Sequence, residues 1–184
     1  MRLVYSFLVY ILIILSPLII IYRILKKKEN PKRFIEKFSI NKQRRAKGKL
    51  IWFHCSSVGE FLSIVPLIHK FERKKSVKQI LVTTSTLSSS KIFEKFKFKK
   101  TLHQFYPLDN KFIINNFLNH WKPSSAIFAE SEIWPIMISE IKKRKIKIVL
   151  INARMTEKTF KRWFSIKRFG KKILEEFDYI FPQN

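Results

Sequence analysis

Six short apolar runs alternate along the chain with longer stretches in which apolar residues recur at helical spacing. The runs are KLIWFH (49–54), QILVTT (79–84), LHQFYP (102–107), SAIFAE (125–130), IKIVLIN (146–152) and DYIFPQ (178–183). Short runs of this kind are typical of buried strands, and the stretches between them carry apolar residues three or four positions apart, as at Phe61, Val65 and Ile68. The alternation predicts an α/β fold with a parallel sheet and helices on both faces, over residues 49–184.

The N-terminal segment has a different pattern. Residues 3–22, LVYSFLVYILIILSPLIIIY, contain no charged side chain. About twenty apolar residues span the hydrocarbon core of a bilayer, so we expect a membrane anchor helix over residues 1–25, in which Ser16 and Pro17 mark a kink or a helix that enters one leaflet only. A signal peptide is the weaker interpretation, because charged residues rather than a small-residue cleavage site follow the run.

Residues 26–48 are strongly basic, with only Glu29 and Glu36 opposing the cations. The positive-inside bias predicts that the globular part lies on the cytoplasmic face of the inner membrane, held by the single anchor. PKRFIEKF, residues 31–38, fits a short helix with Phe34 and Phe38 on one side, which would lie on anionic headgroups. A basic linker with no further role is an equal alternative.

Composition limits the partners. The 184 residues contain 38 Lys and Arg against 13 Asp and Glu, a net charge of +25, which indicates an anionic partner: nucleic acid, anionic lipid or a phosphorylated substrate. The single cysteine, Cys55, excludes an internal disulfide and fits a buried thiol in a reducing compartment. The four histidines lack metal-ligand spacing, so no metal site is expected.

Polar residues follow each predicted strand, where parallel sheets bind their ligands. They are Ser56, Ser57, Gly59 and Glu60, then Thr83, Thr84 and Thr86, then Tyr106 and Asp109, then Glu130 and Glu132, and finally Asn152 and Arg154. Loops are polar in any protein and helix starts favour Ser and Thr, so this clustering alone is mild evidence for a site.

SSVGE, residues 56–60, allows two interpretations. Ser57 and Glu60 fit a capping box, in which the serine hydroxyl accepts from the Glu60 amide and the carboxylate reaches back to the Ser57 amide. Gly59 in the first helical turn costs about 1 kcal/mol relative to Ala, which indicates that something approaches the backbone there. The second interpretation therefore makes Glu60 a catalytic base, with its basicity restored by desolvation under a substrate.

The other motifs also have structural and functional interpretations. Glu130 and Glu132, before Trp134 and Pro135, either complement a helix dipole or point into the binding crevice. TTSTLSSS (83–90) offers hydroxyls and amides for a phosphate or carboxylate, or simply caps a helix. Asn152 and Arg154 fix an anionic substrate, or Arg154 is one more surface cation.

Taken together, these motifs resemble the transferases that add Kdo (3-deoxy-D-manno-octulosonic acid) to the lipid A precursor in Gram-negative bacteria. HCSSVGE is similar to the family pattern H-x-x-S-V/I-G-E, LVTTSTLSSS to T-T-x-T-x-T-G-S, FYPLDN to Y-x-P-x-D, ESEIWP to E-T-E-L/I-W-P, and NARMTEKTF to N-A-R-L-S. The resemblance covers essentially the whole chain and occurs in the same order.

The resemblance implies a GT-B glycosyltransferase with two Rossmann-like domains, of which this chain is similar to the first, the acceptor-binding half in the biosynthesis of the lipopolysaccharide core. It implies transfer of Kdo from CMP-Kdo to lipid IVA with inversion, without a metal or any cofactor. It also assigns Glu60 as general base and Glu130 as support for the transition state, with Glu132 as a companion. Substrate contacts would come from Ser57, Gly59, Thr83, Thr84, Thr86, Ser88, Glu132, Asn152 and Arg154.

The chain departs from the pattern in two places. Leu87 and Ser89 stand where the family has Pro and Gly, which leaves the turn at TTSTLSSS in question. The family's second domain, which holds CMP-Kdo, would begin near Asn184, so we expect this chain alone to be inactive. The alternative function is a non-catalytic, truncated lipid-binding protein. A nucleic-acid partner is not expected, because no recognised motif accompanies the charge and a membrane anchor argues against it.

Overall fold

The computed structural model describes residues 2–40, 42–130, 132–154, 171 and 173–183. Within them lies a six-stranded sheet in the order β3-β2-β1-β4-β5-β6, and every pair of neighbours is parallel. The strands are β1 (Lys49–His54), β2 (Val77–Thr84), β3 (Thr101–Phe105), β4 (Ser125–Ala129), β5 (Lys147–Ala153) and β6 (Tyr179–Pro182). The six apolar runs therefore predicted the strands correctly. The order is that of the Rossmann fold, in which β1 and β4 flank the point where the strand order reverses.

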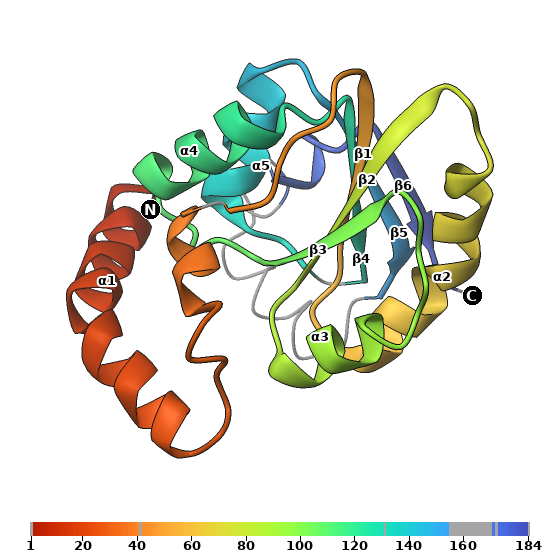
Figure 1. The fold of residues 1–184 in the computed structure, drawn as a ribbon. Coiled ribbons are helices and arrows are strands. Elements are labelled where there is room, and N and C mark those ends of the chain that lie inside the picture. Colours follow the sequence, from red (N-terminus) through yellow and green to blue (C-terminus); the bar gives the residue numbers. More distant parts are fainter. Residues whose placement is uncertain (1, 41, 131, 155–170, 172, 184) are drawn as a thin grey trace.

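Helices cover both faces of this sheet, as the alternating pattern predicts (Figure 1). They are α2 (Val58–Glu72), α3 (Leu87–Phe93), α4 (Lys111–Trp121) and α5 (Pro135–Lys143). Successive residues of β1 point to opposite faces. Trp52 packs in the core with α4 and α5, whereas Phe53 packs in the core with α2, and both side chains are fully buried.

The N-terminal helix α1 (Arg2–Leu25) lies against the domain, on the same side as the 3-10 helix η1 (Phe34–Phe38) and the start of α4 (Figure 1). Tyr5 Oη donates to Asp109 Oδ2 at 2.7 Å, and Ile20 is buried. At the end of α1, Glu29 pairs with both Arg23 and Lys37.

This placement corrects one expectation. A helix does form where the anchor was predicted, over residues 1–25, but among the described residues no helix has the length and apolar character that a bilayer crossing requires. The structure therefore does not support the predicted single spanning anchor. The sequence pattern predicted an apolar helix correctly. It could not predict that Tyr5 and Ile20 of this helix contact the domain.

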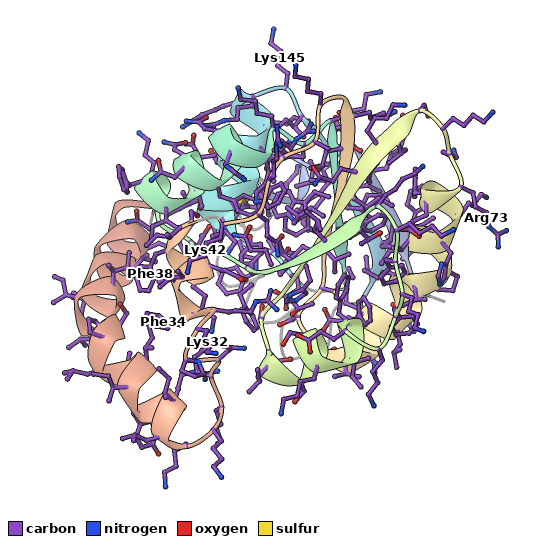
Figure 2. The ribbon with its side chains drawn as sticks, viewed as in Figure 1. Lys32, Phe34, Phe38, Lys42, Arg73 and Lys145 are labelled. Carbon is purple, nitrogen blue, oxygen red and sulfur yellow. The ribbon has the colours of Figure 1, made fainter. Side chains whose placement is uncertain are left out.

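The short helix predicted over residues 31–38 is confirmed in part, because η1 forms over Phe34–Phe38 and a turn precedes it. Arg33 bonds to Glu36 at 2.7 Å and to the carbonyl of His103 at 2.9 Å, which ties η1 to β3. Figure 2 shows Phe34 and Phe38 on the side of η1 toward α1, while Arg73 and Lys145 project from edges of the molecule remote from α1.

Candidate active site at the carboxyl edge of the sheet

Glu60 lies in the first turn of α2, directly beyond the end of β1. Ser57 precedes the helix in an extended conformation, and its Oγ accepts from the Glu60 amide at 3.2 Å. The Glu60 carboxylate turns back and accepts from the Ser56 amide through Oε2, at 2.7 Å. The predicted capping box therefore forms, with Ser56 rather than Ser57 as the amide donor. This contact fixes the carboxylate at the sheet edge, and Glu60 as a whole is 9% exposed.

Gly59 is exposed beside this carboxylate, and the fold itself does not require a glycine there. Its φ is not positive, and a Cβ built on it would meet only Ser57 Oγ, at 4.0 Å. An alanine would fit and would favour the helix. The open space beside Gly59 is what the close approach of a ligand to the α2 backbone needs, so the unusual residue fits a binding role.

Glu130 follows β4 in the left-handed region, with a φ of 56°, and its amide donates to Ile151 of β5 at 2.9 Å. A non-glycine residue in this conformation is uncommon. Burial raises the pKa of Glu130, the charges of Glu60 and Glu132 raise it further, and Arg154 opposes them. Those four charged groups therefore lie close enough to influence one another, as the carboxyl-edge argument predicted.

Glu132 faces inward. Its Oε2 lies 3.2 Å from His54 Nε2 and accepts from Trp134 Nε1 at 2.9 Å. Burial raises the pKa of Glu132, but the hydrogen bonds from His54, Trp134 and Ser56 outweigh burial and hold it below its usual value. In this structure the Glu132 carboxylate has a structural role, since it is bonded within the protein, and its expected substrate contact stays a prediction.

Two predicted substrate contacts, Thr83 and Thr84, are fully buried. Thr83 Oγ1 accepts from Trp52 Nε1 at 2.9 Å and lies 3.0 Å from His54 Nδ1, and Thr84 Oγ1 lies 2.8 Å from His103 Nε2. Both side chains are buried because β2 is covered on both faces to its last residue, and a role as direct substrate contacts stays a prediction.

The turn after β2 acts as a helix cap in this structure. Thr86 Oγ1 accepts from the Ser89 amide at 3.2 Å, and Ser89 Oγ donates to the Ser56 carbonyl at 3.3 Å. Ser89 is fully buried, so the residue that replaces the family's glycine ties this turn to the loop that precedes α2. Thr86 and Ser88 are exposed beside it and remain available to a ligand.

Asn152 and Arg154 come from the end of β5. Asn152 is left-handed like Glu130, with a φ of 51°, and its Nδ2 donates to Ser63 of α2 at 3.3 Å. Arg154 is exposed and acts on Glu130. The structure thus brings Asn152 and Arg154 to the edge of the sheet where Glu60 and Glu130 lie. Residues 155–160 of the NARMTEKTF motif lie outside the described residues.

His54 is the residue of this site that sequence reasoning missed. It is fully buried at the end of β1, between Thr83 and Glu132, with its ring stacked on Tyr106 at a centroid distance of 3.8 Å. The histidines were considered only for metal spacing, although the motif HCSSVGE begins with this residue. Within the described part of the chain, no group of three or more His, Cys, Asp and Glu is arranged to hold a metal ion.

The loop before α2 also places Cys55 among these groups. Its thiol is buried, and burial raises its pKa well above the usual value, with the charges of Glu60 and Glu132 acting in the same direction. The thiol therefore stays protonated and fits the inert role predicted for it.

A doubly wound parallel domain with convergent acidic groups beyond the carboxyl ends of its strands is an architecture that binds nucleotides and sugars. Residues 32–184 match the model of the 3-deoxy-D-manno-octulosonic-acid transferase (kdotransferase) family. The chain is 39% identical over 180 residues to the 3-deoxy-D-manno-octulosonic acid transferase of Rickettsia bellii, which covers 98% of this chain and 43% of that protein. It is also 39% identical over 172 residues to the probable mitochondrial 3-deoxy-D-manno-octulosonic acid transferase of Arabidopsis thaliana, over 91% of this chain and 38% of that protein.

The chain therefore belongs to the Kdo transferase family of glycosyltransferases. It spans less than half the length of these two relatives. A more distant relative, a bifunctional glycosyltransferase/methyltransferase of Fusobacterium nucleatum, is 32% identical over 164 residues, which is 85% of this chain and 25% of that protein.

Proposed function

We propose that this chain is the acceptor-binding half of a GT-B glycosyltransferase that moves Kdo from CMP-Kdo to the lipid A precursor, lipid IVA. The observation that carries the proposal is the position of Glu60, fixed by the Ser56 amide at the carboxyl edge of the sheet, where its charge acts on Glu130. Family membership supplies the reaction, and the geometry supplies a carboxylate where a sugar hydroxyl can meet it.

In the proposed reaction, Glu60 accepts the proton of the attacking acceptor hydroxyl as its oxygen bonds to the anomeric carbon of Kdo. The bond from that carbon to the phosphate oxygen breaks, and CMP leaves with its electrons. Attack from the face opposite the leaving group inverts the anomeric configuration. Glu130 supports positive charge that develops on the sugar, while His54 and Trp134 hold Glu132 as a fixed wall of the site. This mechanism uses no metal and no cofactor.

The membrane role is also a proposal, without a spanning anchor. The outer side of α1 exposes Ile14, Leu18 and Leu25, each at least 69% exposed. The turn that follows α1 carries Lys26, Lys27 and Lys28. An exposed apolar helix next to a cationic turn fits an interfacial position on an anionic bilayer. We place it on the cytoplasmic face of the inner membrane, where it would meet the phosphorylated acceptor.

The test is transfer by a fusion of this chain to the region that follows the aligned segment in the Rickettsia bellii relative. Labelled Kdo is followed from CMP-Kdo to lipid IVA. Glu60→Gln keeps an acceptor for the Ser56 amide but cannot take a proton, so we expect at least a hundredfold loss of kcat with acceptor binding retained. The matched control is Glu175→Gln, which changes a carboxylate that is 62% exposed in the described C-terminal segment.

Two results would contradict the proposal in different ways. Unchanged transfer by Glu60→Gln would show that Glu60 is not the general base. A fusion that binds lipid IVA but transfers nothing, with the unaltered Glu60, favours the alternative of a non-catalytic lipid-binding protein.

A further inference from the structure

A cavity of about 530 Å³ lies between α1 and the domain. Its apolar lining includes Val9, Ile13 and Ile20 of α1, and Leu108 and Trp134 on the domain side. Native cores rarely hold voids larger than a water molecule, so a space of this size within a predominantly apolar lining falls in the range of ligand sites rather than of packing defects.

The polar side chains around the cavity are bonded within the protein. Tyr5 donates to Asp109, and Arg23 and Lys37 both pair with Glu29. Water inside the apolar part would find few partners there. The body of the preferred occupant is therefore apolar.

The shape of the cavity also indicates which kind of apolar ligand fits it. Its lining extends along α1 from Tyr5 to Arg23, a distance of about 27 Å at the rise of a helix. A long, unbranched chain fits such a groove better than a compact ring system. Near Arg23, at one end of the groove, the polypeptide continues into the cationic turn Lys26, Lys27 and Lys28. This turn complements an anionic headgroup.

The groove also reaches the candidate active site. Trp134, which lines the cavity, donates its Nε1 hydrogen to Glu132 Oε2 at 2.9 Å, and Glu132 contacts His54 at the end of β1. Only the Trp134 side chain therefore separates an occupant of the groove from Glu132, whose charge acts on Glu130.

We infer that the groove between α1 and the domain binds one acyl chain of the phosphorylated lipid acceptor. This inference rests on the proposed function for the identity of the lipid. The chain lies along Val9 and Ile13, and the headgroup stays at the mouth, within reach of the basic turn.

The first experiment uses alkyl phosphates as probes of the unaltered chain. Octyl, decyl, dodecyl and hexadecyl phosphate are titrated below their micellar concentrations by calorimetry. Affinity should rise about fourfold per methylene and then level off once the groove is full. A continued rise over the whole series indicates adsorption to the surface and overturns the inference.

The second experiment fills the groove. Val9→Phe with Ile13→Phe places two larger side chains in the cavity, and Ile11→Phe with Ile14→Phe introduces two phenylalanines at exposed positions of the same helix. Circular dichroism checks that each variant is folded. The groove variant should bind dodecyl phosphate at least tenfold more weakly, with the exposed variant unchanged. The inference is overturned if neither variant loses affinity for dodecyl phosphate, and also if both lose it to the same extent.

The third experiment identifies the lipid. Lipid IVA should displace dodecyl phosphate from the chain, whereas vesicles of phosphatidylglycerol at the same lipid concentration should not. Equal displacement by both assigns the groove to bulk membrane lipid and overturns the inference. Glu60→Gln should leave dodecyl phosphate binding unchanged, so a failure of the proposed chemistry is distinguishable from a failure of the groove.

Discussion

His54 Nε2 lies 3.2 Å from Glu132 Oε2, which joins the end of β1 to the loop that follows β4. The other ring nitrogen, Nδ1, lies 3.0 Å from Thr83 Oγ1 of β2. A single buried imidazole therefore links three neighbouring strands at the edge where the carboxylates gather. Its contact with Glu132 explains why that carboxylate is fixed in place.

This link gives a prediction for acid stability. Because the pKa of Glu132 is lowered in the folded protein, its contribution to the free energy of unfolding is present above the ordinary value of 4.5 and is lost as the pH falls below it through the folded pKa. Glu132→Gln should lower the free energy of unfolding by about 1–3 kcal/mol at pH 7 and by much less at pH 3. Urea unfolding at both pH values measures this, with Glu175→Gln as control. An equal loss at both values would show that the charge of Glu132 is not what stabilises the link.

Glu130 should behave in the opposite way. Its pKa is raised, so its favourable contribution is present below pH 4.5 and is lost as the pH rises through the folded pKa. Glu130→Gln removes repulsion from Glu60 and Glu132 and should make the protein slightly more stable at pH 7, with no gain at pH 3. In the fusion enzyme the same variant should reduce kcat. A variant that is less stable at pH 7 would contradict the like-charge assignment.

Gly59→Ala separates stability from binding. Because a Cβ at Gly59 meets only Ser57 Oγ at 4.0 Å, alanine should raise the free energy of unfolding by up to about 1 kcal/mol. If a ligand approaches this backbone, the KM for the acceptor should rise at the same time. Unchanged KM would leave Gly59 without a binding role.

The comparison variant is Gly48→Ala. Gly48 has a φ of +107°, and a Cβ there would lie 2.7 Å from Lys78 Cγ. This substitution should lower the free energy of unfolding, since L side chains rarely adopt that conformation. The KM of the folded enzyme should not change.

Asp109 connects two helices, and two variants distinguish its contacts. It accepts from Tyr5 Oη at 2.7 Å and from the Ile136 and Met137 amides at 3.1 and 2.8 Å, which caps α5. Tyr5→Phe should remove about 0.5–1.5 kcal/mol from the docking of α1 and leave α5 unchanged. Asp109→Ala should destabilise both helices.

Hydrogen exchange of backbone amides provides the measurement. Faster exchange in α1 alone is expected for Tyr5→Phe, and faster exchange in α1 and α5 for Asp109→Ala. Unchanged exchange of α1 in both variants would show that the Tyr5 contact does not hold that helix.

The strands were predictable because a parallel sheet covered on both faces needs continuous apolar runs, and KLIWFH and SAIFAE follow that rule. The site was predictable in outline for a related reason, since Glu60, Glu130 and Asn152 each follow a strand. The burial of Thr83 and Thr84 was not predicted, because a hydroxyl at the end of a strand has the same sequence pattern whether it points into the core or out of it.

The position of α1 could not be predicted, because its apolar residues suit lipid and protein equally well. What decides it is the contact of Tyr5 with Asp109, 104 positions away, together with the burial of Ile20, and only the tertiary structure brings these about. The structural role of Glu132 depended in the same way on His54, which lies 78 positions away along the chain.

The buried thiol of Cys55 makes this chain convenient for site-specific labelling. It is the only cysteine in the sequence, it is fully buried, and its raised pKa keeps it protonated at neutral pH. A fluorophore attached to a cysteine newly introduced on α1 would therefore report on that helix alone in the native protein. Alkylation of Cys55 itself would then count the molecules in which the end of β1 has opened.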